Sequence, residues 1–230
     1  MLSAEDAAEI TVSMITMNEE KAVAKVIADI QRTVPGVEIL IVDSSSDRTP
    51  EIAAELGAKV IRQFPPQGYG PAMDTALRSG RGSVVITLDC DDTYPVDAIP
   101  TMAKAVLHDG IDLVDGSRLK TKPAAMPWVN FLANFGFAAM ASILFCTRIT
   151  DLHSGMRAYR RSMLDALKYD PRGPALPVEL LLRPLHQGYA LKVIFIDYHE
   201  RVGVSTMQPL PSAWWTLKRI LRVRFSSSKT

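Results

Sequence analysis

Three carboxylates stand within four positions of the chain, at Asp89, Asp91 and Asp92. They follow an apolar, largely β-branched stretch, residues 84–88, which predicts a strand buried on both faces inside a parallel sheet. Side chains alternate along extended backbone, so Asp89 and Asp91 should point to one side and Asp92 to the other. Carboxylates this close repel each other, and a bound divalent cation removes that conflict. Hard oxygen ligands suit Mg²⁺ or Mn²⁺, which makes Asp89 and Asp91 the expected metal ligands.

Taken alone, the motif fits a solvated acidic turn ahead of a helix opened by Pro95 about equally well. The surrounding chain favours a site, because short apolar strands alternate with amphipathic helices through the first half. The sequence therefore predicts an α/β fold with a mostly parallel central sheet flanked by helices, and a ligand site at the carboxyl ends of its strands. Strands are predicted over residues 10–15, 38–43, 59–62, 84–88, 112–116 and 191–196, and helices over 18–34, around Pro50, up to about 78, over 95–108 and over 177–188.

The second half of the chain departs from this alternation. Residues 128–145 are strongly apolar but contain Asn130 and Asn134, which favours a helix that is amphipathic or packed under the site over one that spans a membrane. Residues 151–159 are predicted to form a polar loop. Residues 211–230 mix tryptophan, aliphatic and basic residues, as a helix in a membrane interface does, or one docked on the core with its basic face in water. We expect a main domain over 1–210 and a basic amphipathic tail over 211–230.

Composition excludes some classes of function. The net charge of +1 over 230 residues gives no reason to expect a nucleic-acid partner. Two cysteines do not form a disulfide framework, and the first residues show no signal-peptide pattern. Together these features predict a cytoplasmic protein, with peripheral contact at the inner membrane face if the tail binds lipid.

Seven short motifs occur in an order that resembles family 2 glycosyltransferases of the GT-A fold, in particular the polyprenyl-phosphate hexosyltransferases typified by dolichyl-phosphate mannose synthases. The motifs lie at residues 12–20, 40–49, 67–72, 89–92, 116–118, 151–161 and 201–205. The chain departs from the family pattern in three places. Ser44 replaces a second aspartate, and Gln67 and Thr206 stand where lysines are common.

The resemblance implies a nucleotide-diphosphate sugar donor, of the GDP-mannose or UDP-glucose type, and a lipid phosphate acceptor. The positions that it implies for the donor nucleotide are Thr16, Asn18, Glu19, Asp43, Gln67, Gly68, Asp89 and Cys90. For the acceptor they are Arg118, Arg157, Arg201 and Ser205, and for catalysis Asp91, Asp151, Arg118 and Arg201. Asp43 fits a helix cap equally well.

The identity of the nucleophile decides what else the site needs. A lipid phosphate is already anionic and needs cations to orient it, whereas a hydroxyl acceptor needs a general base, for which Asp151 is the best candidate. Single displacement by either nucleophile inverts the anomeric centre. Two alternatives therefore remain: a hydroxyl or amine acceptor outside the membrane, and a non-catalytic nucleotide-sugar binding module. The intact pair of Asp89 and Asp91 speaks against the second.

Overall fold

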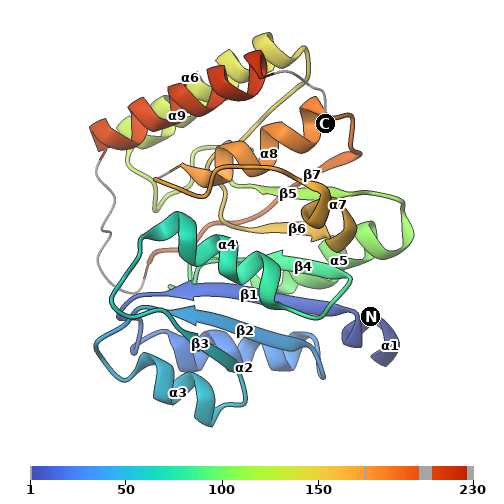
Figure 1. Ribbon diagram of the computed structural model, residues 1–230, viewed down its shortest axis with the longest axis vertical. Coiled ribbons are helices and arrows are strands. Elements are labelled where there is room, and N and C mark those ends of the chain that lie inside the picture. Colours follow the sequence, from blue (N-terminus) through green and yellow to red (C-terminus); the bar gives the residue numbers. More distant parts are fainter. Residues whose placement is uncertain (1, 174, 202–208, 227–230) are drawn as a thin grey trace.

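A seven-stranded sheet forms the centre of the described chain, with helices on both faces (Figure 1). The computed structural model describes residues 2–173, 175–201 and 209–226. The strand order is β3-β2-β1-β4-β6-β5-β7, and every pair is parallel except those that β6 makes with β4 and β5. The strands are β1 (Ile10–Thr16), β2 (Glu38–Asp43), β3 (Lys59–Arg62), β4 (Val84–Thr87), β5 (Leu113–Ser117), β6 (Arg157–Arg160) and β7 (Leu191–Phe195).

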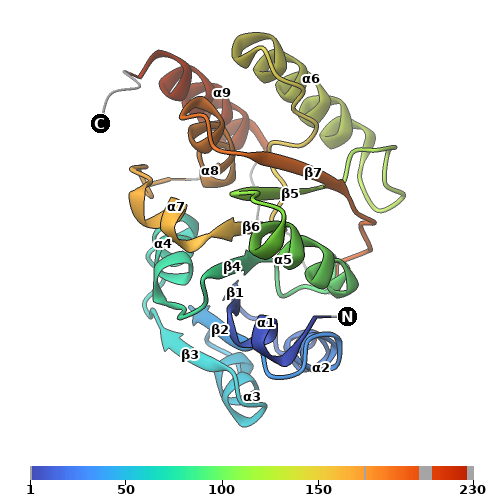
Figure 2. The ribbon, with the colours of Figure 1, turned by 90° about the vertical axis from the view of Figure 1, so that its right-hand side faces the viewer.

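The helices divide between the two faces of the sheet, as Figure 2 shows. One core lies between the sheet and α2 and α5, and the other between the sheet and α4, α7 and α8. Strand β4 serves both, because Val84 and Ile86 face the first core while Val85 faces the second. The helices are α1 (Ala4–Ala8), α2 (Val23–Thr33), α3 (Thr49–Glu55), α4 (Tyr69–Ser79), the 3₁₀ turn η1 (Val96–Ala98), α5 (Ile99–His108), α6 (Trp128–Phe145), α7 (Arg161–Ala166), α8 (Leu176–His186) and α9 (Pro209–Phe225).

The strand order reverses at β1, which makes the carboxyl ends of β1 and β4 the switch point of the sheet, a region that we call the crevice. From β1 the chain runs outward through β2 and β3, and then returns to place β4 on the other side of β1. Such a switch point is where open α/β sheets bind their ligands. The predicted mostly parallel sheet with helices on both faces is confirmed, and the acidic motif leaves β4 directly into this crevice.

Strand β6 corrects one prediction from the sequence. The polar loop expected over residues 151–159 is wrong at its end, because Arg157–Arg160 pairs antiparallel with both neighbours. Its charges are neutralised across the sheet, where Arg157 lies opposite Asp115 of β5 and pairs with it at 2.7 Å. A strand whose arginines find partners about 40 positions away in sequence does not show an apolar pattern.

Helix α6 corrects a second prediction. It packs beside α9 in both ribbon views (Figures 1 and 2), and it meets the loop over residues 151–155 only along one side, where Phe137 packs against His153. Within α6 only Ala138 and Ala141 are buried. Its exposed large side chains are Trp128, Val129, Leu132, Phe135 and Ile143. Among the described residues, α6 is the one helix long and apolar enough to cross a membrane.

Candidate active site

Asp91 is the most completely buried of the three carboxylates after β4, with 1% of its surface exposed. Its Oδ1 atom accepts hydrogen bonds from the backbone N and Oγ1 of Thr93, at 3.2 and 2.6 Å. Its Oδ2 atom receives no hydrogen bond from the described residues, although Nη2 of Arg201 forms an ion pair with it at 2.5 Å. A divalent cation could bind this buried oxygen by displacing Arg201.

Asp89 is held close to backbone from the 151–155 loop. A Cβ atom added at Gly155 would lie 3.0 Å from Asp89 Oδ2, so the loop approaches this carboxylate as closely as glycine allows. Gly155 itself is fixed, because its N–H donates to the hydroxyl of Tyr94 at 2.7 Å.

The charge of Asp91 raises the pKa values of two neighbouring carboxyl groups, Asp89 and Glu19. Burial and the charge of Asp91 raise the pKa of Asp89 to about 6, and burial and the same charge raise the pKa of Glu19 to about 7. The guanidinium of Arg201 opposes both shifts. Three carboxylates therefore share a site with too little positive charge, which a divalent cation would supply.

Asp89 and Asp91 fit a divalent cation that is bound together with a diphosphate. The described residues contain no cluster of three or more histidine, cysteine, aspartate or glutamate side chains arranged to hold a metal. Mg²⁺ is commonly bound by one or two carboxylates together with substrate phosphates, and the pair of aspartates meets that requirement.

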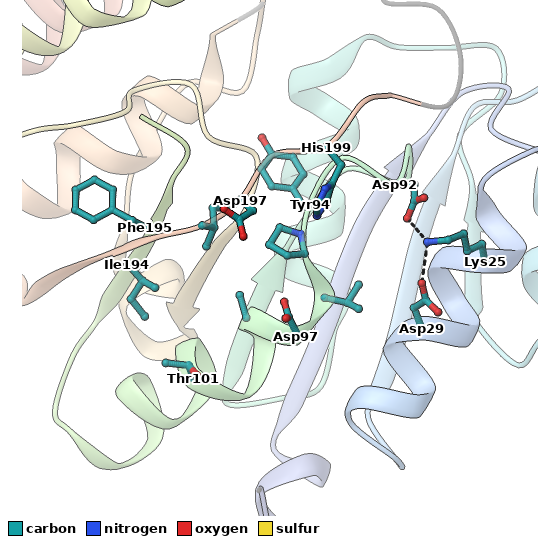
Figure 3. A pocket seen from close by; sticks show the side chains of 14 residues that line it. Lys25, Asp29, Asp92, Tyr94, Asp97, Thr101, Ile194, Phe195, Asp197 and His199 are labelled. Atoms are coloured by element: carbon teal, nitrogen blue, oxygen red, sulfur yellow. Dashed lines mark hydrogen bonds and ion pairs between the residues drawn. The ribbon is translucent and has the colours of Figure 1, made fainter. Parts of the chain in front are cut away.

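Asp92 points away from the pair, as expected, but strand alternation is not the reason, because β4 ends at Thr87 and Asp92 has a left-handed φ of 64°. It pairs with Lys25 at 2.6 Å and lines a separate open cavity of about 700 Å³ (Figure 3). The side chains labelled in that view are Lys25, Asp29, Asp92, Tyr94, Asp97, Thr101, Ile194, Phe195, Asp197 and His199. Neither Asp89 nor Asp91 lines this cavity, so it is distinct from the crevice that holds the carboxylate pair.

The loops after β1 and β2 meet around Asp43, which is fully buried. Thr16 Oγ1 donates to its Oδ1 atom at 2.6 Å, Ser45 donates through both N and Oγ, and the guanidinium of Arg62 pairs with Oδ2. These interactions use the lone pairs of the carboxylate. Asp43 and Thr16 therefore build the loops, and Arg62, whose side chain is 44% exposed, is the charged group that they hold at the end of β3.

Arg62 was missed from the sequence, although it ends a predicted strand at the ligand-binding edge. The remaining positions expected to bind the nucleotide surround the same crevice edge. Asn18 and Gln67 are exposed, Gly68 opens α4 with φ of 101°, and Cys90 is buried, which raises the pKa of its thiol.

The arginines expected to bind the acceptor occupy three different environments. Arg118 is 9% exposed and grips Asp151 with two hydrogen bonds, Nε to Oδ2 at 2.7 Å and Nη2 to Oδ1 at 3.0 Å. Arg201 is a third exposed in its side chain and pairs with Asp91. Arg157 is fully buried, paired with Asp115 and bonded to backbone carbonyls. The expectation that Arg157 binds an acceptor is therefore wrong, because its guanidinium has no access to a ligand.

Two further positions complete the expected set. Asp151 is fully buried; burial alone would raise its pKa, but Arg118 outweighs this and lowers the pKa to about 2. Ser205 lies outside the described residues.

Comparisons with known proteins agree with the family resemblance of the sequence motifs. The model of glycosyl transferase family 2 matches residues 11–168. A dolichyl-phosphate hexose transferase of Haloferax volcanii is 41% identical over 216 residues, which cover 94% of this chain and 93% of the relative. A polyprenol monophosphomannose synthase of Mycolicibacterium smegmatis is 28% identical over 209 residues, covering 84% of this chain and 78% of the relative.

A solved structure shares the fold. Glucosyl-3-phosphoglycerate synthase from Mycobacterium tuberculosis in complex with UDP superposes with a TM-score of 0.75 at 22% identity, covering 96% of this chain and 82% of that chain. The expected GT-A fold is thereby confirmed. The family model covers well over half of the chain, and the Haloferax relative matches nearly all of it. The chain therefore belongs to glycosyl transferase family 2 and is a glycosyltransferase.

Proposed function

We propose that this enzyme transfers a hexose from a nucleotide-diphosphate sugar, of the GDP-mannose or UDP-glucose type, to a polyprenyl or dolichyl phosphate. One observation carries the proposal: the charges of two arginines, Arg201 and Arg118, act on the aspartate pair. Arg201 pairs with Asp91. Burial and Asp91 raise the pKa of Asp89, while Arg201 and Arg118 oppose that rise, so both guanidinium groups lie within electrostatic reach of it. The carboxylates suit a cation that binds the diphosphate of the donor, and the guanidinium groups suit the phosphate of the acceptor.

On the donor side, the chain must accommodate the charge that develops as the sugar departs. Asp89 and Asp91 would hold Mg²⁺ or Mn²⁺, which supplies positive charge to the leaving diphosphate. Asn18, Glu19, Gln67 and Gly68, at the rim of the same crevice, would contact the nucleotide. The half-exposed Arg62, whose guanidinium is held by Asp43, joins this set as a further cation for the donor.

On the acceptor side, Arg118 and Arg201 would bind and aim the lipid phosphate. A phosphate oxygen attacks the anomeric carbon, the bond from that carbon to the diphosphate breaks, and the configuration inverts. The nucleophile is anionic at neutral pH, so no base has to remove a proton. Positioning and charge are then the chain's whole contribution to the step.

The Haloferax relative supports this choice of acceptor. It matches this chain over nearly the full length of both proteins and is named as a dolichyl-phosphate hexose transferase. The site is less suited to a hydroxyl acceptor, which needs a general base to remove its proton. Its base would be Asp151, whose two oxygens are engaged by Arg118 and whose pKa of about 2 makes it a poor proton acceptor.

A lipid acceptor requires the site to work next to a membrane, and α6 provides the better candidate surface for that contact. Its exposed face carries Trp128 and Phe135, and it contains no charged residue. Helix α9 runs beside it and exposes Trp214, Lys218 and Arg222. An apolar face flanked by tryptophan and basic residues suits a bilayer interface with anionic lipid. We include peripheral contact through α6 and α9 in the proposal, and location at the inner membrane face stays a prediction.

A transfer assay tests the proposal. The purified chain is incubated with labelled nucleotide sugars, Mg²⁺ or Mn²⁺, and a short polyprenyl phosphate, and lipid-linked sugar is measured. Asp91→Asn should lower the rate by about a hundredfold or more, as loss of a charge-stabilising group does. Asp92→Asn is the matched control, because Asp92 faces the separate cavity, and it should retain most activity. The proposal would be contradicted if none of the nucleotide sugars gave lipid-linked product, or if both variants lost activity equally.

A further inference from the structure

His153 lies where the active-site loop meets the two outer helices. Its Nε2 atom is 2.8 Å from Oγ1 of Thr216 on α9, and its ring packs edge-on against Phe137 of α6 with centroids 6.2 Å apart. Its backbone N–H donates to Asp151 Oδ1 at 3.0 Å. One residue therefore contacts α6, α9 and the carboxylate that holds Arg118.

The hydrogen bonds fix which ring nitrogen carries the proton. The single hydroxyl hydrogen of Thr216 is donated to the carbonyl of Ser212 at 2.9 Å, so Oγ1 can only accept from the imidazole. Nε2 of His153 is thus the protonated nitrogen, and the buried Nδ1 atom has no hydrogen-bond partner among the described residues. Burial lowers the pKa of His153 to about 4, so the ring is neutral near pH 7.

The other end of this connection reaches the proposed acceptor site directly. Arg118 donates to Asp151 from three atoms: its backbone N at 3.2 Å, Nε at 2.7 Å and Nη2 at 3.0 Å. The orientation of the guanidinium is therefore set by that carboxylate, and the carboxylate in turn is bound by the amide of His153. From the hydroxyl on α9 to Arg118, each contact is a hydrogen bond of ordinary length.

We propose that His153 is a positioning residue that ties the acceptor-binding arginine, Arg118, to helices α6 and α9. The place of α9 then fixes the ring, the ring fixes the 151–155 loop, and the loop fixes Asp151 and Arg118. This rests on the proposed function in one respect, that Arg118 binds the acceptor phosphate. Helices α6 and α9 form the surface proposed to meet the membrane. The connection therefore makes acceptor binding depend on the position of these two helices relative to the 151–155 loop.

Two pairs of substitutions separate the hydrogen bond from side-chain bulk. Thr216→Val removes the hydroxyl and keeps the shape, whereas Thr216→Ser keeps the hydroxyl. His153→Gln places an amide N–H near the position of Nε2, whereas His153→Asn is too short to reach Thr216. Thr33→Val is the matched control, because the hydroxyl of Thr33 makes the same kind of bond to a carbonyl four residues earlier, in α2.

The readout is the KM for polyprenyl phosphate against the KM for the nucleotide sugar. Thr216→Val and His153→Asn should raise the acceptor KM about tenfold, because a small misplacement of an orienting group is costly. The donor KM should not change, and Thr216→Ser, His153→Gln and Thr33→Val should behave as the native enzyme does. Native-like acceptor KM in Thr216→Val would overturn the proposal. An equal rise in both KM values would also overturn it, since that indicates general loss of packing.

Amide hydrogen exchange keeps this test independent of the transfer assay. The amides of His153 and Arg118 both donate to Asp151, and they should exchange faster in Thr216→Val than in Thr216→Ser. If no lipid phosphate accepts sugar, the proposed function fails while the exchange rates still decide whether His153 connects α9 to Arg118. Equal exchange in the two variants would reject the connection.

Discussion

The ionic neighbour of Asp91 Oδ2 is the guanidinium of Arg201, 2.5 Å away, and a divalent cation at the same oxygen would have to displace it. Arg201→Gln should therefore bind Mn²⁺ more tightly than the native chain in the absence of nucleotide. Removing one competing charge is worth roughly 1–2 kcal/mol here, or about five- to thirtyfold in affinity. Titration calorimetry or the paramagnetic signal of free Mn²⁺ measures the change.

Lys25→Gln provides the control for that experiment. Lys25 pairs with Asp92 at 2.6 Å, one position beyond Asp91 but on the opposite side of the motif. Its loss should leave Mn²⁺ affinity nearly unchanged. Weaker Mn²⁺ binding in Arg201→Gln would show that Arg201 assists the cation instead of competing with it.

His153 gives a pH dependence whose sign follows from its pKa of about 4, against an ordinary value of 6.5. Burial lowers it; Asp151 raises it, Arg118 and Arg157 lower it, and α6 and α9 face it with uncharged side chains. Between pH 6.5 and 4 the unfolded chain binds a proton that the folded chain does not. The free energy of unfolding therefore falls on acidification through this range, with a slope of up to ~1.4 kcal/mol per pH unit.

Urea unfolding of the native chain and of His153→Gln, at several pH values between 4 and 7, isolates this term. The variant should show a shallower fall in the free energy of unfolding. Parallel curves would mean that the imidazole titrates in the folded chain near its ordinary pKa.

At the scale of elements, α6 leads to a prediction about lipid binding. Leu132 and Phe135 are each more than 60% exposed, so replacing both with glutamate should not disturb the core. Burying either in a bilayer interface is worth roughly 1.5–3 kcal/mol, so the double variant should bind anionic vesicles at least tenfold more weakly. Flotation of vesicles with the bound protein measures this partition.

Phe64→Glu is the matched control for the vesicle experiment, because Phe64 is 59% exposed and lies on the loop after β3. Deleting the tail would be a poorer test. Helix α9 buries Ile220 and Val223, and its Arg219 is ion-paired with Glu179 of α8. Truncation would expose this core and remove one of the two arginine partners of the buried Glu179. Undiminished binding by the double variant would exclude α6 as the contact.

At this scale the sequence predicts an element well when the pattern lies within that element, and poorly when the element depends on partners distant in the sequence. The apolar stretch before Asp89 predicted β4 and the crevice, because periodicity and burial agree there. Strand β6 could not be found in this way, since its charges are neutralised by Asp115 of β5 and by Asp112 just before that strand. Arg157 matched a family motif, yet the motif does not record that its partner, Asp115, takes it into the core. Apolar composition predicted α6 as a helix but could not indicate whether that helix faces protein, water or lipid.

At the scale of the whole molecule, the fold and the cation site should be thermodynamically separable. The two cores on either side of the sheet contain none of the carboxylates of the site, and Arg201 already balances part of their charge. Chelating divalent cations should therefore leave Tm unchanged in the absence of nucleotide. A nucleoside diphosphate with Mn²⁺ should raise Tm, because the pair binds only the folded chain.

The size of that rise can be estimated. At a hundred times Kd, ligand binding adds ~2.7 kcal/mol to the free energy of unfolding, which for a domain of this length is roughly 5–10 °C in Tm. Asp91→Asn should lose most of this rise in Tm and Asp92→Asn should keep it, because Asp91 belongs to the carboxylate pair of the crevice and Asp92 faces the separate cavity. Comparing uridine and guanosine diphosphates in the same scan also identifies the base. A drop in Tm on chelation alone would show that the cation is part of the fold, and the carboxylates would then have a structural role.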